Sequence, residues 1–186
     1  MPTQSVYLTF DDGPHPTATP EVLQVLQSHK VAATFFLTGQ NIAGNESLVR
    51  EIATEGHTIG VHGFRHSRAP AFSKEKTRSE ILHTEEALYN ITPLSKKIFR
   101  PPFGFFFWQT ISATKDLGYQ IIMWTALTGD FRQQNNSRVI STALRHLSAG
   151  SVLVFHDNDR TRGKIGPIVS ECLQRIQESG YSLAAI

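Results

Sequence analysis

The chain has 186 residues, a length that suits one domain with a single hydrophobic core. Its 18 Lys and Arg against 16 Asp and Glu give a formal net charge of +2, and no run of basic residues stands out, so no nucleic-acid partner is expected. The single cysteine, Cys172, excludes an intrachain disulfide and a cysteine-based zinc site, and its helix-spaced apolar neighbours predict a core position.

The first residues, Met1 to Gln4, are polar and lack a basic start followed by a long apolar stretch. The chain as written therefore carries no export signal, and a cytoplasmic location is expected. Removal of a leader segment would change this expectation to the cell envelope or the exterior. No apolar run approaches the roughly 20 residues of a membrane-spanning helix. No feature of the sequence predicts an obligatory protein partner.

Short apolar or β-branched runs alternate along the chain with amphipathic segments of helical spacing. The predicted strands are 6–10, 33–37, 58–62, 97–100, 119–124, 151–155 and 181–185. The predicted helices are 19–28, 45–55, 73–89, 107–117, 137–147 and 165–179. Gly56, Gly118, Gly150 and Gly180 each separate a predicted helix from the next strand, where helix C-termini favour glycine.

The regular alternation of strand and helix predicts parallel strands with crossover helices, and so an α/β architecture. Periodicity alone does not distinguish a doubly wound sheet from a barrel. In both, sites form at the carboxyl ends of the strands. Polar side chains are predicted at these ends: Asp11, Asp12, His62, Arg100, Asp130 and His156.

Two adjacent carboxylates, Asp11 and Asp12, follow the first predicted strand, directly before Gly13 and Pro14, which turn the chain. Neighbouring residues of a strand point to opposite sides. The two carboxylates can therefore take different roles, one as a metal ligand and the other as a free base.

His62 and His66 lie four residues apart, a spacing that on a helical turn places two side chains on one face. A bare pair of this kind is more often one surface histidine and one satisfied core histidine than a metal site. Asp12 favours the metal interpretation, because two imidazoles and one carboxylate leave positions open for water and substrate. Such ligands suit zinc, and also iron, cobalt, nickel or manganese.

Five segments resemble, in order and spacing, the motifs of the polysaccharide deacetylases, the NodB-like carbohydrate esterases. They are 9–14 (TFDDGP), 62–66 (HGFRH), 100–104 (RPPFG), 127–131 (LTGDF) and 154–157 (VFHD). The resemblance runs from Val6 to the C-terminus and implies one catalytic domain over residues 1–186, folded as a distorted β/α barrel of about seven parallel strands. It implies a metal-dependent hydrolase that removes N-acetyl groups from N-acetylglucosamine-containing glycans, such as peptidoglycan or chitin-like chains.

The resemblance also implies roles for individual residues. Asp12, His62 and His66 would hold one divalent metal ion, with Zn2+ as the first choice. Asp11 would take a proton from the metal-bound water as general base. Arg100 would keep Asp11 ionised and oriented, because a nearby cation favours the charged carboxylate.

His156 would be the general acid that protonates the departing sugar amine, and Asp130 beside its ring would raise the imidazole pKa. The backbone N–H of Phe103 would stabilise the developing oxyanion. The expected substrate-binding residues are Pro102, Phe103, Phe131 and Val154.

Several positions depart from the family pattern. Gly63 replaces a Ser or Thr whose hydroxyl would brace the histidine loop, and we expect weaker metal affinity. Leu127 and Phe131 replace an Asp and a Trp, and Val154 replaces a Leu in the wall of the acetyl pocket. Together these changes indicate a divergent branch with a different substrate groove.

Aromatic residues crowd the segment after Arg100 and either stack on sugar rings or pack in the core: Phe103, Phe105, Phe106, Phe107 and Trp108. Trp124 is expected in the core. The charged loop 157–164 either walls the groove or is a solvated connection.

Two other functions stay open. One keeps the site but changes the substrate to an O-acetyl ester of xylan or a small amide. The other is a non-catalytic glycan-binding relative, which is disfavoured because the base, ligands and acid are all present.

Overall fold

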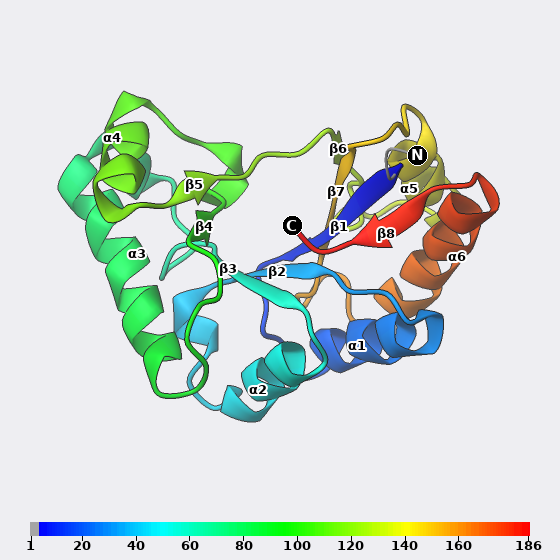
Figure 1. Cartoon of the computed structure of the whole chain (residues 1–186), viewed down its shortest axis with the longest axis horizontal. Coiled ribbons are helices and arrows are strands. Elements are labelled where there is room, and N and C mark those ends of the chain that lie inside the picture. Colours follow the sequence, from blue (N-terminus) through cyan, green and yellow to red (C-terminus); the bar gives the residue numbers. More distant parts are fainter. Residues whose placement is uncertain (1–3) are drawn as a thin grey trace.

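The structure, a computed structural model, describes residues 4–186. Helices surround one curled sheet of parallel strands (Figure 1). The strands are β1 (Ser5–Asp11), β2 (Thr34–Leu37), β3 (Thr58–Val61), β4 (Ile98–Phe99), β5 (Gln120–Ile121), β6 (Ala126–Leu127), β7 (Val152–His156) and β8 (Ser182–Ala184). The residues Met1–Thr3, on which part of the expectation about an export signal rests, lie outside the described residues.

Six α-helices and three short 3-10 turns connect the strands in the part of the chain that the structure describes. The helices are α1 (Ala18–His29), α2 (Glu46–Thr54), α3 (Lys74–Tyr89), α4 (Trp108–Leu117), α5 (Asn136–Leu144) and α6 (Ile165–Glu178). The 3-10 turns are η1 (Gly39–Asn41), η2 (Ala69–Phe72) and η3 (Pro102–Gly104).

The strand order is β5-β4-β3-β2-β1-β7-β6, and β8 pairs with the beginning of β1. Every pairing is parallel. Among residues 4–186, no ladder joins the edge strands β5 and β6, so the sheet is a half-barrel rather than a closed one. The distorted barrel of about seven parallel strands is confirmed in this open form.

Two of the three two-residue strands, β5 and β6, differ from the sequence prediction. The predicted strand 119–124 contains only the two-residue β5, and β6 was not predicted at all. Two residues are too few to show a period of two, so pattern could not locate β6. Gly118 ends α4 in the left-handed conformation as expected, with φ 72°, whereas α5 ends at Leu144, well before Gly150.

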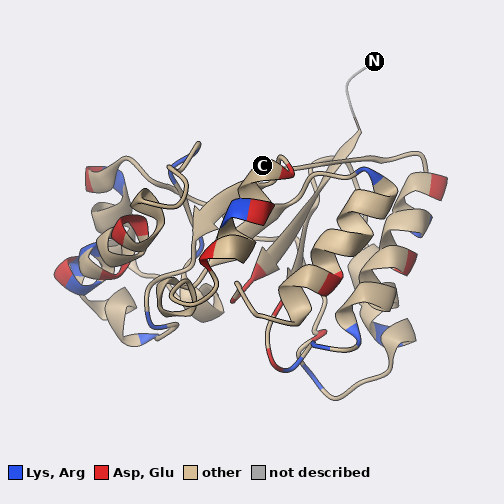
Figure 2. Cartoon of the chain, turned by 90° about the horizontal axis from the view of Figure 1, so that it is seen from below, with Lys and Arg blue, Asp and Glu red and all other residues tan. Residues whose placement is uncertain are grey.

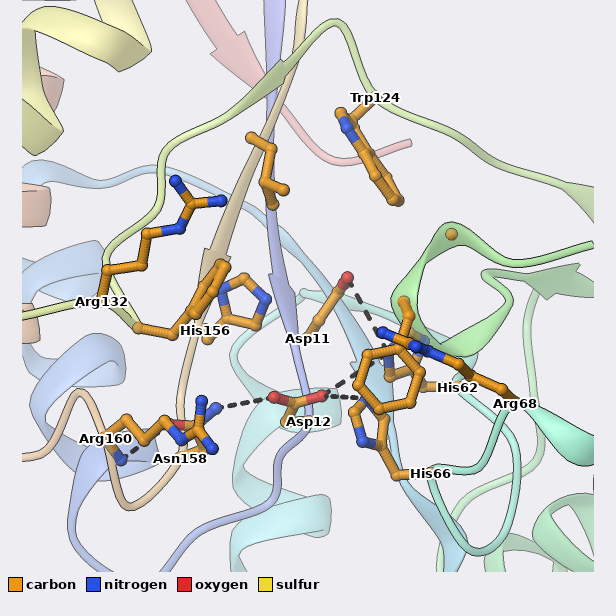
Figure 3. A pocket seen from close by; sticks show the side chains of 14 residues that line it. Asp11, Asp12, His62, His66, Arg68, Trp124, Arg132, His156, Asn158 and Arg160 are labelled. Carbon is orange, nitrogen blue, oxygen red and sulfur yellow. Dashed lines mark hydrogen bonds and ion pairs between the residues drawn. The ribbon is translucent and has the colours of Figure 1, made fainter.

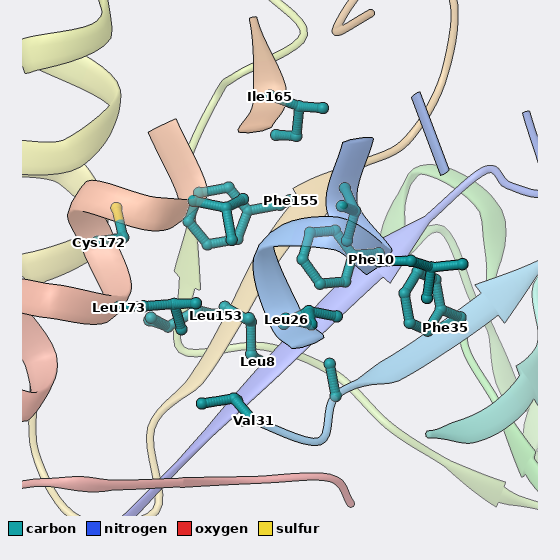
Figure 4. Packing of buried hydrophobic residues seen from close by; sticks show 14 of the residues in the cluster. Leu8, Phe10, Leu26, Val31, Phe35, Leu153, Phe155, Ile165, Cys172 and Leu173 are labelled. Atoms are coloured by element: carbon teal, nitrogen blue, oxygen red, sulfur yellow. The ribbon is translucent and has the colours of Figure 1, made fainter. Parts of the chain in front are cut away.

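The main hydrophobic core lies between the sheet and the helices, with α1 and α6 packed on it (Figure 4). Phe10 of β1 stacks on Phe35 of β2, with ring centroids 5.1 Å apart, and contacts Phe155 of β7 at 6.0 Å. Side chains alternate along a strand. Leu8 and Phe10 therefore fill this core, while the intervening Thr9 contacts the polar interior of the half-barrel. Cys172 is fully buried in α6, as predicted.

Charged residues of both signs are scattered over the helices and loops (Figure 2). This distribution agrees with the small net charge. Within residues 4–186, no helix has both the length and the apolar character needed to cross a membrane.

Candidate active site

The carboxyl ends of the central strands open into one pocket of about 520 Å³ (Figure 3). Asp11 is the last residue of β1, and His156 is the last residue of β7. Parallel strands bring their carboxyl ends to one edge, which is why residues far apart in sequence meet here. The pocket brings together seven of the predicted site residues: Asp11, Asp12, His62, His66, Phe103, Phe131 and His156.

Asp12, His62 and His66 form a compact group of one carboxylate and two imidazoles. Their potential ligand atoms all lie within 4.8 Å of one another. Oδ1 of Asp12 is 3.0 Å from Nε2 of His66 and 3.5 Å from Nε2 of His62. This oxygen is buried without a well-aligned hydrogen bond. An orphaned carboxylate oxygen facing two ring nitrogens fits a divalent cation, and the donor set suits zinc.

The other oxygen of Asp12 is held by a residue that the sequence did not single out. Nδ2 of Asn158, in the loop after β7, donates a 2.6 Å hydrogen bond to Oδ2 of Asp12. The carboxylate is thus fixed with Oδ1 toward the histidines. The sequence signal was that Asn158 directly follows the fifth motif and lies in the loop 157–164, a candidate wall of the groove.

The segment 62–66 is an irregular loop, so the helical-turn geometry expected for the histidine pair is wrong. Gly63 and His66 have φ values of 75° and 46°, and this backbone path brings the rings of His62 and His66 to 5.1 Å. Oε2 of Glu80 in α3 accepts hydrogen bonds from the backbone N–H groups of residues 64 and 65, at 2.6 and 2.8 Å. This carboxylate braces the loop from outside the motif.

His62 is oriented by its second ring nitrogen. Nδ1 lies 2.7 Å from the carbonyl oxygen of Arg100, so Nδ1 carries the proton and donates it there. Burial lowers the pKa of His62. A neutral imidazole with a free Nε2 is the form that binds a metal ion.

Backbone conformations that L residues rarely adopt gather around the pocket. Among residues 4–186, four non-glycine residues have positive φ: Asp12, Lys30, His66 and Phe103. Lys30 merely ends α1, whereas the other three line the pocket. Such conformations cost free energy and cluster at functional sites, where they aim side chains or backbone groups.

Asp11 is paired with a fully buried arginine. Nη1 of Arg100 donates to Oδ1 of Asp11 and to Oγ1 of Thr9, both at 2.7 Å. Two backbone carbonyl oxygens accept from the same guanidinium, and the ring of Phe36 lies 4.1 Å from its central carbon. With its donors distributed in this way, Arg100 anchors Asp11 through one oxygen and leaves Oδ2 on the pocket side.

His156 and Asp130 form the second charged pair. Nδ1 of His156 is 2.8 Å from Oδ1 of Asp130, and the backbone N–H of His156 donates to Oδ2 at 2.7 Å. Burial opposes the imidazolium, but the hydrogen bond and the charge of Asp130, with Asp11 and Asp12 nearby, raise the pKa of His156 to about 9. His156 is therefore protonated at neutral pH.

Two predicted substrate-binding residues lie away from the pocket. Pro102 is buried beneath the histidine loop, next to Gly63, and Val154 is fully buried in β7. In contrast, Leu127 and Trp124 line the pocket. The core position expected for Trp124 is wrong, because β5 ends at Ile121 and leaves the tryptophan in the connection between β5 and β6, from which it lines the pocket.

Three arginines also line the pocket, none of which the sequence singled out as a site residue. They are Arg68, Arg132 and Arg160 (Figure 3). Arg160 and Asn158 belong to the loop 157–164, so this loop is a wall of the site rather than a solvated connection.

The fold and these residues define a class: a β/α half-barrel with a hydrolase-like centre, comprising a potential metal-ligand group, a candidate base and a protonated histidine. The family model described as polysaccharide deacetylase matches residues 1–122. The chain belongs to the polysaccharide deacetylase family, as its five motifs predicted.

The relatives are named as deacetylases of peptidoglycan sugars or of chitooligosaccharides. The peptidoglycan-N-acetylglucosamine deacetylase of Bacillus cereus is 29% identical over 183 residues, covering 97% of this chain and 85% of the relative. The chitooligosaccharide deacetylase of Bradyrhizobium sp. is 31% identical over 156 residues, covering 83% and 71%. Some relatives are longer: the chain spans only 38% of PgdA from Listeria monocytogenes.

Solved structures agree with this assignment. The crystal structure of the Bc1960 peptidoglycan N-acetylglucosamine deacetylase superposes with a TM-score of 0.90 at 28% identity. The match covers 100% of this chain and 87% of that protein. Together the comparisons support a carbohydrate deacetylase, a hydrolase.

Proposed function

We propose that residues 1–186 form one catalytic domain that hydrolyses N-acetyl groups of N-acetylglucosamine units in peptidoglycan or chitin-like glycans. One observation carries the proposal: the Asp12, His62 and His66 group shares a single pocket with Asp11, which is paired with the buried Arg100. The names of the relatives favour N-acetylated glycans over the alternative O-acetyl xylan or small-amide substrates.

Asp12, through Oδ1, and the two histidines, through Nε2, would hold one divalent cation, with Zn2+ favoured by this donor set and Co2+, Ni2+, Fe2+ or Mn2+ as alternatives. When bound, such a cation polarises the acetyl carbonyl and lowers the pKa of a coordinated water.

Asp11 acts as general base. Its Oδ1 is held by Arg100, and its Oδ2 lies 4.0 Å from Nε2 of His62, on the side of the ligand group. Oδ2 takes one proton from the attacking water, whose oxygen forms the new bond to the acetyl carbon. The backbone N–H of Phe103, which donates no hydrogen bond to any of the described residues, is available for the carbonyl oxygen as negative charge develops there.

His156 acts as general acid. Nδ1 is engaged by Asp130, which leaves Nε2–H for the substrate. As the C–N bond breaks, this proton passes to the sugar nitrogen, and acetate and a free amine leave. The raised pKa of His156 keeps the acid protonated near neutral pH.

The test is acetate release from N-acetylglucosamine oligomers by metal-stripped protein, with and without added zinc or cobalt. We expect metal-dependent release, and at least a loss of about a hundredfold in kcat for Asp11→Asn, because the substitution removes the base. Asp116→Asn, which removes an exposed carboxylate that pairs with Lys74 in a surface ion pair, is the matched control.

Zinc binding by Asp11→Asn, measured by titration calorimetry, should remain, because the ligand group is intact. Release without metal, or an Asp11→Asn variant as active as the wild type, would refute the mechanism. Metal binding without any release would favour an ester, a small amide or a binding role.

A further inference from the structure

An exposed aromatic surface lies beside the pocket. We call Phe72, Phe105 and Phe107 the aromatic platform. Their side chains are 60%, 41% and 42% exposed. The ring centroids are 4.9 Å apart for residues 72 and 107, 5.6 Å for 105 and 107, and 6.2 Å for 72 and 105. This exposure excludes the core-packing interpretation of the cluster after Arg100.

The platform is continuous with the candidate active site. The ring of Phe103 lies 4.4 Å from the ring of His66. The guanidinium of Arg68 sits over Phe103 at 4.6 Å and over Phe105 at 5.6 Å. Figure 3 shows Arg68 on the same side of the pocket as His62 and His66. A row of flat groups therefore leads from a candidate metal ligand out to the platform.

Two neighbouring turns hold the platform in place. Phe72 ends η2, Phe105 follows η3 directly, and Phe107 directly precedes α4. Oγ1 of Thr110 in α4 contacts the carbonyl oxygen of Ala71 at 3.5 Å and also accepts from the backbone N–H of Phe107 at 3.4 Å. The rings are thus presented to solvent by backbone that is tied together across the two turns.

The chemistry of the platform suits a carbohydrate. Exposed apolar patches of this kind mark interaction sites. Aromatic rings carry negative charge on their faces, and the C–H groups on the apolar face of a pyranose are weakly positive. Arg68 adds a planar fork of N–H donors. Within residues 4–186, no carboxylate lies within 4.0 Å of this guanidinium, so it can donate to sugar hydroxyl or acetyl oxygens.

We propose that the aromatic platform is a remote subsite that binds sugar rings of the glycan chain beyond the N-acetyl unit undergoing hydrolysis, and that it makes the enzyme favour long oligomers. The occupant is the glycan itself, because the platform continues the pocket through Phe103 and Arg68. The inference rests on the proposed function, since it takes the substrate chain as the ligand.

The test compares kcat/KM on the N-acetylglucosamine dimer and hexamer. We expect the wild type to favour the hexamer, and Phe105→Ala/Phe107→Ala to lose about tenfold on the hexamer, equivalent to about 1.4 kcal/mol, with the dimer unchanged. Phe105→Leu/Phe107→Leu keeps apolar bulk but removes the ring faces and should behave in the same way. Tyr89→Ala, which removes a 74% exposed ring at the end of α3, is the control and should change neither value.

Two results would overturn the proposal that the platform is a subsite, while leaving the deacetylase proposal intact. One is the same preference for the hexamer in the wild type and both double variants. The other is a leucine variant that behaves as the wild type while the alanine variant loses activity on the hexamer, which would indicate general apolar contact rather than ring stacking.

If no oligomer is deacetylated, the proposed function fails, and hexamer binding measured by titration calorimetry decides on the platform. About tenfold weaker binding by both double variants supports it, and equal or absent binding overturns it. Cosedimentation with phosphatidylglycerol vesicles that the double variants lose, with hexamer binding unchanged, would assign the surface to a membrane instead.

Discussion

At the residue scale, the surroundings of two histidines in one pocket shift their pKa values in opposite directions, so that one is neutral and the other is charged at neutral pH. Burial without a direct carboxylate hydrogen bond lowers the pKa of His62, whereas Asp130 outweighs burial and raises the pKa of His156 to about 9. The neutral imidazole suits a ligand, and the charged one suits an acid. When their surroundings push the pKa values of two titratable groups apart in this way, the two groups can take different roles within one site.

The charge of Asp130 should set the alkaline limit of activity. His156 must be protonated to act as an acid, so kcat/KM should fall as the pH rises through about 9. Asp130→Asn removes the charge but keeps the side-chain shape, and we expect the alkaline limb to move to lower pH. Profiles of kcat/KM against pH check this, with Asp116→Asn, at an exposed carboxylate outside the pocket, as control. If the alkaline limb of the pH profile is the same in Asp130→Asn as in the wild type, His156 is excluded as the acid that titrates there.

At the scale of elements, the ends of β1 and β7 carry site residues, while a loop and a helix supply supporting contacts. β1 alternates between the apolar core, through Leu8 and Phe10, and the half-barrel interior, through Thr9. Beyond the strands, Asn158 holds Asp12, and Glu80 of α3 braces the histidine loop. Such supporting hydrogen bonds orient metal ligands and tune their affinity.

The contact from the loop after β7 can be tested by Asn158→Ala. Without the 2.6 Å hydrogen bond, the Asp12 carboxylate is free to rotate away from the histidines. We expect zinc or cobalt affinity to fall by about 10- to 100-fold, as measured by titration calorimetry. Asn90→Ala, at the exposed end of α3, should bind as the wild type does. Equal affinity in both variants would show that Asp12 needs no such support.

At the scale of the whole molecule, β1 is the centre of both the sheet and the site. It pairs with β2, β7 and β8, and its Phe10 contacts rings from the strands on both sides. The site is thus built on a strand that neighbours hold on both sides and whose last four residues are buried, which gives its groups a rigid base.

Truncation of the central ring should therefore destabilise the entire fold. Phe10→Ala leaves a cavity between three strands and α1, and we expect the free energy of unfolding to fall by about 3–5 kcal/mol. Urea denaturation measures this loss. Phe106→Ala, at a 36% exposed ring, should change it by only about 0.5 kcal/mol. Similar small losses in both variants would mean that the core around Phe10 collapses to fill the space.

The sequence by itself determined the alternation of strands and helices, the polar residues at the strand ends, and the family, because periodicity, turn residues and motifs are local properties of the chain. It could not locate β6, whose two residues are too short for a pattern. It placed Trp124 in the core because no local pattern marks where β5 ends. It placed Val154 at the pocket, although Val154, the β7 partner of Thr9, is fully buried.

Only the tertiary structure decided which distant groups meet. The contact of Asn158 with Asp12, the brace from Glu80, and the aromatic platform shared by η2 and η3 each join segments that are separate in the chain. Their energies come from hydrogen bonds and packing across space rather than from local preference. For that reason the sequence predicted the residue types of the pocket, while the fold determined the hydrogen bonds that support them and the aromatic platform beside them.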